Sequence, residues 1–304
     1  MKAVVLHEYG PPSNLKYEDF DDPKPGEGEV LVRVSAASIN PVDLKMRSGA
    51  AKERFPVEFP GILGRDVAGV VREVGEGVTD FIAGDRVMAL AWHTYAELCI
   101  VKASELAKIP EGVETTTAAA IPLVSVTGNQ IVTDAAKAQS GQTILITGAL
   151  GSVGRCAVYS AKELGAKVIA GVRTKQLDEA KALPGVVEAI ALDDDDALAR
   201  LGLVDCIADT VGGNTASKLL AKVKQGGCFG SVLGPPKDAA LHPTVQVNAI
   251  MAHPDPATYV RYAEAIKARK FELPIECMMP LAEAAKAHAD LEKGGIRGKV
   301  ILVA

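Results

Sequence analysis

The sequence lacks the features that mark a nucleic-acid-binding, membrane or secreted protein. Its formal net charge is −5, which leaves no surplus of positive charge for a nucleic acid partner. No apolar run approaches the length needed to span a bilayer. The apolar stretch 1–6 is too short for a secretion signal and passes directly into polar sequence. We therefore expect a cytoplasmic protein that binds neither nucleic acid nor a membrane.

Close cysteine pairs are also missing. The five cysteines are scattered and form no CxxC motif, which excludes a locally built zinc knuckle and a thioredoxin-like redox site. Cys156, Cys206 and Cys228 lie in apolar runs, and we interpret them as buried core residues.

The first part of the chain is rich in short strands separated by turn residues. We expect strands at 30–34, 67–74, 86–90 and 95–101. Short strands at regular spacing favour a small barrel over a layered α/β unit. With 304 residues, the chain is long enough for a second domain.

The later part alternates strands with helices. An alanine-rich helical stretch at 115–136, interrupted by Pro122, leads into it. Alternation of this kind predicts a parallel sheet covered on both faces. Six buried strands match a complete dinucleotide-binding sheet. We place them at 143–147, 168–172, 189–192, 204–209, 228–233 and 244–250.

Two prolines, Pro254 and Pro256, mark the end of this alternation. A helix (257–269), a strand, a helix and a last strand (299–303) follow, and they do not extend the six-stranded unit. We therefore assign the tail to the first domain. The predicted domains are 1–122 with 255–304, and 123–254.

The strongest local motif is a glycine-rich turn between the strand 143–147 and a helix that begins near Ser152. Glycines allow close backbone approach, and the amides at the helix start seat a pyrophosphate. Strand, turn, helix and second strand occur in the order of a dinucleotide-binding site. The predicted cofactor-binding residues of this turn are Gly148, Ala149, Gly151, Ser152, Val153 and Gly154.

Four ordered motifs resemble the medium-chain dehydrogenase/reductase superfamily. They are Asn40-Pro41-Val42-Asp43-Leu44-Lys45, Gly64-Arg65-Asp66-Val67-Ala68-Gly69, Val74 to Val87 and the turn Gly148 to Gly154, with Gly298-Lys299-Val300 near the end. The most similar branch is that of the zinc-free quinone oxidoreductases and alkenal or enone reductases. The resemblance implies an α/β fold: a GroES-like β-barrel domain and a Rossmann domain with a six-stranded parallel sheet, the active site lying between them.

The resemblance also addresses the metal. Zinc-dependent relatives carry a cysteine where this chain has Asn40, and a His-Glu pair where it has Arg65-Asp66. Amide and guanidinium groups do not replace thiolate and imidazole as zinc ligands. We therefore expect no metal.

Cofactor choice depends on the residues that follow the second strand. A carboxylate there would select NAD, whereas this chain has Arg173, Thr174 and Lys175. Their cations suit a 2′-phosphate, so we predict NADP(H); the alternative is a solvated basic loop. Leu192 stands where many relatives have a tyrosine near the adenosine phosphate.

Two residues are the predicted catalytic groups, by resemblance. Lys45 would hydrogen-bond the nicotinamide ribose or the substrate oxygen, and the alternative is a surface lysine. Asn40 would border the nicotinamide, and the alternative is a side chain that caps a turn.

The resemblance further assigns Thr127, Gly212, Ser231 and Lys299 to cofactor binding. For Thr127 the alternative is a hydroxyl inside a helix. Trp92 and His93 lie in a loop before a strand and are interpreted as ordinary packing residues; the alternative is part of a substrate wall. The run 193–196, four consecutive aspartates, is interpreted as a solvated loop near a helix N-terminus.

These residues favour an NADPH-dependent, metal-free reductase of quinones or α,β-unsaturated carbonyls. The family resemblance further implies a homodimer joined through 244–250. Two alternatives stay open. One is an enoyl-thioester reductase, and the other is a non-catalytic NADPH-binding sensor or structural protein.

Overall fold

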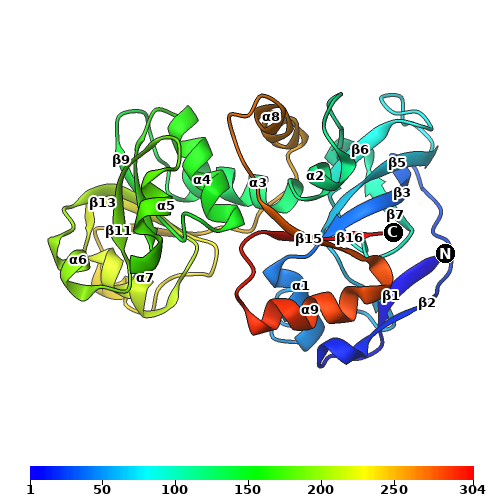
Figure 1. Cartoon of the computed structure of the whole chain (residues 1–304), viewed down its shortest axis with the longest axis horizontal. Coiled ribbons are helices and arrows are strands. Elements are labelled where there is room, and N and C mark those ends of the chain that lie inside the picture. The colour runs from blue at the N-terminus through cyan, green and yellow to red at the C-terminus, as the bar shows by residue number, and fades with distance from the viewer. The chain divides into compact units, whose positions relative to one another are not determined.

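The computed structural model describes residues 1–304, and the chain divides into two compact units (Figure 1). The first unit comprises Met1–Leu123 together with Pro254–Ala304, and the second comprises Val124–His253. None of the helices combines the length and the apolar character that a membrane span requires.

The second unit is built on a six-stranded parallel sheet, in green to yellow in Figure 1. Its strand order is β11-β10-β9-β12-β13-β14, so the chain starts in the middle and fills one side before the other. The strands are β9 (Thr143–Thr147), β10 (Lys167–Val172), β11 (Val186–Ala191), β12 (Val204–Asp209), β13 (Val223–Ser231) and β14 (Gln246–Ala249).

Helices cover both faces of this sheet. Ile144 and Ile146 of β9 point into one apolar core, and Leu145 between them points into another, as the two-residue period of a strand requires. The helices are α3 (Pro122–Gln130), continued by a π-helical turn at Ile131–Ala135, α4 (Ser152–Glu163), α5 (Leu177–Lys181), α6 (Asp195–Arg200) and α7 (Gly213–Leu220).

The first unit holds two sheets. The three-stranded sheet has the order β2-β1-β4, and the larger sheet has the order β15-β16-β3-β5-β6-β8, with β7 also paired to β3. The strands are β1 (Lys2–Leu6), β2 (Leu15–Asp19), β3 (Glu29–Ser38), β4 (Gly61–Ile62), β5 (Asp66–Val74), β6 (Arg86–Leu90), β7 (Leu98–Lys102), β8 (Leu106–Lys108), β15 (Ile275–Pro280) and β16 (Lys299–Val303).

The last strand closes the first unit, because β16 pairs antiparallel with β3 (Ile301 opposite Ser38). This pairing places the C-terminal strand beside β3, which precedes the Asn40 motif. The helices of this unit are α1 (Pro41–Ser48), α2 (Thr115–Ala119), α8 (Pro256–Lys267) and α9 (Ala284–Lys293).

The expected six-stranded parallel sheet is confirmed, and it accompanies a separate, mainly antiparallel β unit. The expected strand at 95–101 is wrong in its first half, because β7 begins only at Leu98. Tyr95 lies in the preceding turn, where its N–H donates to Leu63 O and its ring is fully buried. Strands β1, β2, β4 and β8 were not among the expected elements.

Candidate active site

A tight turn joins β9 to α4 at the carboxyl end of the parallel sheet. Gly148 has a φ of 64°, a backbone conformation that residues other than glycine rarely adopt. A Cβ at Gly154 would lie 2.0 Å from the Gly148 carbonyl oxygen, so only glycine lets the helix pack this closely on the turn. The first amides of α4 have no partner within the helix and are available to an anion.

Hydrogen bonds fix the neighbouring strand end beside this turn. The Thr210 hydroxyl donates to Thr147 O at 2.7 Å, and the Thr147 hydroxyl donates to Asp209 Oδ1 at 2.7 Å. β9 and β12 are the adjacent strands from which the chain departs in opposite directions. Such a switch point is where open α/β sheets bind nucleotides.

A cavity of about 510 Å³ opens at this switch point, entirely within the second unit. It is lined by residues of the turn, the end of β10 and the loops after β11 and β12. The lining residues are Gly148, Leu150, Gly151, Val172, Arg173, Gln176, Leu192, Asp193, Thr210, Val211 and Thr215. The structure thus brings the predicted Gly148, Gly151 and Arg173 together around one cavity.

The loop after β10 is bound by an acidic side chain from the loop after β11, a contact that the sequence interpretation did not predict. Asp193 Oδ1 accepts hydrogen bonds from both the Thr174 amide (2.7 Å) and the Thr174 hydroxyl (2.8 Å). These bonds, with the charge of Arg173, lower the pKa of Asp193. The predicted phosphate-binding loop after β10 is therefore bound by a carboxylate from the loop after β11.

The rest of the aspartate run diverges, as interpreted. Asp194 caps α6 by accepting from the amides of Asp196 and Ala197, and Asp195 pairs with Lys218. No three histidine, cysteine, aspartate or glutamate side chains of the chain gather in a way that could hold a metal ion.

Several predicted cofactor residues do not line this cavity. Ser231 is fully buried and donates to Asp209 at 3.3 Å, and the Gly212 amide also donates to Asp209. Ala149 is buried, and Lys175 is exposed. Thr127 lies half-buried on α3. Their assignment to cofactor binding stays a prediction.

The cavity fits a dinucleotide in two respects. The turn presents a backbone surface at Gly148 and Gly151 that a Cβ would partly fill, and Arg173 places a cation at the end of β10. These are the groups that would hold the pyrophosphate and the adenosine ribose of a nicotinamide cofactor.

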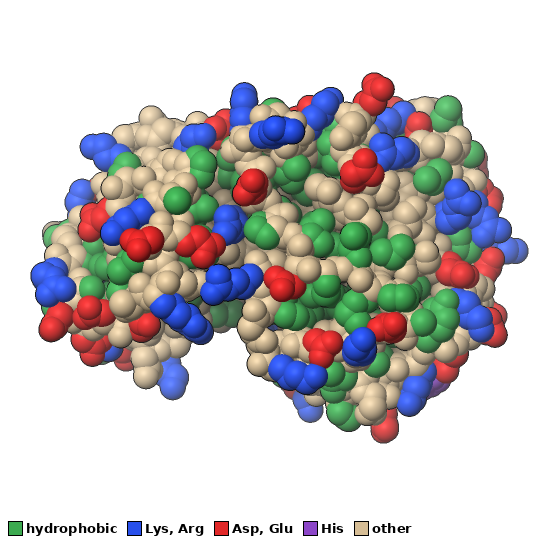
Figure 2. Space-filling model, in the orientation of Figure 1, with side chains coloured by type: hydrophobic (Ala, Val, Ile, Leu, Met, Phe, Trp, Pro, Cys, Tyr) green, Lys and Arg blue, Asp and Glu red, His purple; other side chains and the backbone are tan.

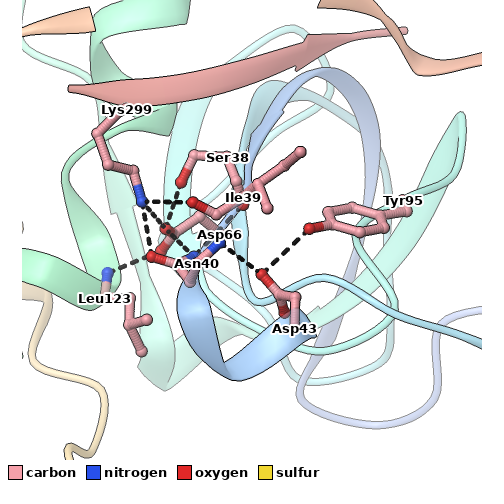
Figure 3. Close-up of polar contacts among 8 residues, drawn as sticks. All are labelled: Ser38, Ile39, Asn40, Asp43, Asp66, Tyr95, Leu123 and Lys299. Atoms are coloured by element: carbon pink, nitrogen blue, oxygen red, sulfur yellow. Dashed lines mark hydrogen bonds and ion pairs between the residues drawn. The ribbon is translucent and has the colours of Figure 1, made fainter. Parts of the chain in front are cut away.

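The first unit contains a buried polar cluster around Asp66, the first residue of β5 (Figure 3). Its Oδ2 accepts from the Ser38 hydroxyl at 2.5 Å and from Asn40 Nδ2 at 2.8 Å, and its Oδ1 accepts from the Leu123 amide at 2.7 Å. The ammonium of Lys299 lies 3.5 Å away, with both side chains buried. One carboxylate of β5 thus joins β3, β16, Asn40 and the Leu123 backbone, all within the first unit.

Asn40 and Lys299 face each other inside this cluster. Lys299 Nζ donates to Asn40 Oδ1 at 2.6 Å and to Ile39 O at 3.2 Å. Figure 3 shows the lysine reaching from β16 toward both Asn40 and Asp66. The Asn40 side chain is therefore engaged within the protein. The catalytic role of Asn40 and the cofactor role of Lys299 stay predictions.

A second carboxylate lies behind Asn40. Asp43 Oδ2 accepts from the Asn40 backbone N–H at 2.8 Å and from the Tyr95 hydroxyl at 3.1 Å. Burial raises the pKa of Asp43 to about 7, and the nearby charge of Asp66 adds to this. His288 approaches the Tyr95 hydroxyl at 3.4 Å, and burial lowers the pKa of this histidine to about 3.

Lys45 and Arg65 lie at the edge of this region. Lys45 is exposed on α1. Arg65 is buried and stacks on the half-exposed Trp92, its guanidinium carbon 3.5 Å from the ring centroid. The sequence interpretation treated Trp92 as a packing residue and missed this contact, because the two residues are distant in sequence.

Comparison with known proteins agrees with this architecture. The model of the alcohol dehydrogenase GroES-like domain matches residues 26–111, and the model named zinc-binding dehydrogenase matches residues 185–302. A quinone oxidoreductase from Pseudomonas aeruginosa is 30% identical, covering 99% of each chain. An acryloyl-coenzyme A reductase from Sulfurisphaera tokodaii is 31% identical, covering 75% of each. The mycobacterial protein Rv1454c, solved in complex with NADPH, superposes with a TM-score of 0.85 at 28% identity, covering 100% of both chains.

The two-unit fold, the glycine turn and these likenesses define an oxidoreductase that uses a nicotinamide cofactor. The chain belongs to the medium-chain dehydrogenase/reductase family, in the branch of the quinone oxidoreductases.

Proposed function

We propose that the protein is an NADPH-dependent reductase that transfers hydride, without a metal, to a quinone or an α,β-unsaturated carbonyl. The observation that carries this proposal is the cavity in which the glycine turn and Arg173 meet. NADPH, when bound, would supply the hydride. The names of the relatives support the substrate class, since both a quinone oxidoreductase and an acryloyl-coenzyme A reductase are among them.

The residues of the chain then have distinct tasks. The turn amides between Gly148 and Gly154 bind the pyrophosphate, and Arg173 with Lys175 binds the 2′-phosphate. Asn40, held by Lys299 and Asp66, borders the nicotinamide, and Lys45 hydrogen-bonds its ribose. Metal-free chemistry is supported by Asn40, whose amide oxygen already accepts from Lys299 at 2.6 Å.

The second candidate is an enoyl-thioester reductase. It is favoured by the likeness to the acryloyl-coenzyme A reductase, which spans three quarters of the chain. The two candidates share the hydride acceptor, a conjugated carbonyl, and differ in the carrier attached to it. A homodimer joined through β14 is part of the proposal, since β14 is an edge strand of the parallel sheet.

Turnover of a substrate panel tests the proposed function. We expect NADPH oxidation with quinones, alkenals and enones, measured by loss of absorbance of the reduced nicotinamide. Acryloyl-coenzyme A belongs in the panel, and a preference for it over the free enone would favour the thioester candidate. Tight NADPH binding with no turnover of any acceptor would favour the non-catalytic alternative.

Cofactor preference is tested by a double variant, Arg173→Ala with Lys175→Ala. Removing both cations should weaken NADPH at least tenfold more than NADH, because only NADPH carries the 2′-phosphate. Dissociation constants from nicotinamide fluorescence give the comparison. Asp193→Asn is a companion variant, since removing this carboxylate should favour NADPH. Equal losses for the two cofactors in the double variant would contradict the phosphate assignment.

A further inference from the structure

The guanidinium of Arg65 is fixed by one hydrogen bond and one aromatic contact, and it has no acidic partner. Its Nε donates to Ala91 O at 2.9 Å, and one face lies 3.5 Å from the centroid of the Trp92 ring. The backbone is fixed as well, because Arg65 O accepts from the Ala91 amide at 2.7 Å. The next residue, Asp66, is anchored by the buried cluster described above.

The terminal nitrogens of Arg65 have no partner within the protein. The side chain is only 8% exposed, yet the structure gives it a single hydrogen bond, through Nε, and no carboxylate within ion-pair distance. Burial lowers the pKa of this guanidinium, although the charges of Asp43 and Asp66 oppose the effect. The two terminal nitrogens are not fully enclosed, so a ligand at the Trp92 surface can accept hydrogen bonds from them.

The surroundings of Arg65 suit a flat, conjugated ligand. Trp92 is 42% exposed, and Phe55 lies beside it with ring centroids 6.1 Å apart. Trp92 is the single tryptophan of the chain, and aromatic residues make up only 4% of it. An aromatic wall beside in-plane N–H donors matches a planar molecule that ends in a carbonyl oxygen.

We propose that Arg65 is a substrate-binding catalytic residue that donates from its terminal nitrogens to the carbonyl oxygen of a conjugated substrate at the Trp92 surface. This rests on the proposed reductase function. The β-carbon of the substrate would gain the hydride that NADPH supplies as it is oxidised. The C=C π pair then forms the double bond of the enolate, the carbonyl π pair moves onto the oxygen, and Arg65 stabilises this oxyanion. A proton from water adds to the α-carbon and restores the carbonyl, while the guanidinium stays protonated throughout. Because Arg65 is fixed before the charge develops, it needs little reorganisation.

Kinetics of Arg65→Met provide the first test. With 2-cyclohexenone as acceptor, we expect kcat/KM to fall about 100- to 1000-fold, the usual effect of removing one oxyanion donor. The affinity for NADPH should change less than twofold, and Arg65→Lys should recover part of the activity. Arg261→Met is the matched control, since Arg261 also lies over an aromatic ring, that of Tyr262. A loss below threefold, or an equal loss of NADPH affinity, would overturn the proposal.

Trp92 fluorescence provides a second readout that is independent of turnover. Titration with 2-cyclohexenone, with and without NADP⁺, should quench the wild type with saturation, whereas Arg65→Met should show only linear collisional quenching. Circular dichroism confirms that each variant is folded. Saturable, Arg65-dependent quenching without turnover would reject the reductase function and keep the binding site. An absence of saturation in the wild type under both conditions would reject the binding site.

Discussion

Replacing Lys299 with methionine is expected to lower the free energy of unfolding by about 3 to 5 kcal/mol, as is usual when one partner of a buried ion pair is removed. The variant leaves the Asp66 carboxylate without its cation and the Asn40 amide oxygen without its donor. Both groups are buried, so water does not replace the lost bonds. Urea unfolding followed by circular dichroism measures the change.

A surface ion pair supplies the matched control. Lys218 lies 2.5 Å from Asp195, closer than Lys299 lies to Asp66, but its side chain is 53% exposed and that of Asp195 is 80% exposed. Lys218→Met should therefore change stability much less, because water screens the exposed pair. Equal effects of the two substitutions would show that burial does not set the strength of the Asp66 cluster.

The double variant Lys299→Met with Asp66→Asn separates charge from packing. We expect it to lose less stability than the sum of the two single variants, because removing both charges avoids an uncompensated buried one. Strict additivity would contradict an electrostatic coupling between Lys299 and Asp66.

The stability advantage of Asp43→Asn over the wild type is expected to grow by up to about 4 kcal/mol between pH 4 and pH 8. The pKa of Asp43 is about 7 in the folded protein and 3.8 in the reference state. The folded state therefore binds more protons than the unfolded state within this window, and the contribution of Asp43 to stability falls as the pH rises. Asparagine keeps the oxygen that accepts from Asn40 and Tyr95 but carries no charge.

Asp205, whose pKa is lowered where that of Asp43 is raised, is the control for this pH dependence. Hydrogen bonds from Lys224 and from the Thr143 amide lower the pKa of Asp205. Its contribution to stability is present above the reference pKa and is lost as the pH falls, so Asp205→Asn should be less stable than the wild type at pH 8. Chemical unfolding at several pH values measures both variants. A pH-independent difference between Asp43→Asn and the wild type would show that Asp43 is not held neutral.

Charged side chains of both signs lie on the face of the molecule shown in Figure 2. Figure 2 shows lysine and arginine side chains interspersed with aspartate and glutamate over the face that it displays. No continuous basic area is visible on that face.

Local pattern was enough to predict the nucleotide-binding half of the fold. The presence of six strands and the glycine turn follow from short apolar runs, spacing and the special backbone of glycine, which act within a few residues. The order of the strands in the sheet came from the tertiary structure. The barrel half was predicted less completely. Its short strands β1, β4 and β8 pair with distant segments, as β1 does with β4, so their local sequence carries a weak signal.

The sequence by itself determined the fold class, the turn between Gly148 and Gly154 and the cations that follow β10. Only the tertiary structure decided which partner each charged side chain meets: Lys299 meets Asp66, Asp193 meets Thr174, and Arg65 meets Trp92. Thr174 and Asp193 are separated by 19 positions in the sequence, and Asp66 and Lys299 by 233. The physical reason is that helix, strand and turn preferences act over neighbouring residues, whereas burial and charge pairing depend on where strand pairing brings distant residues together.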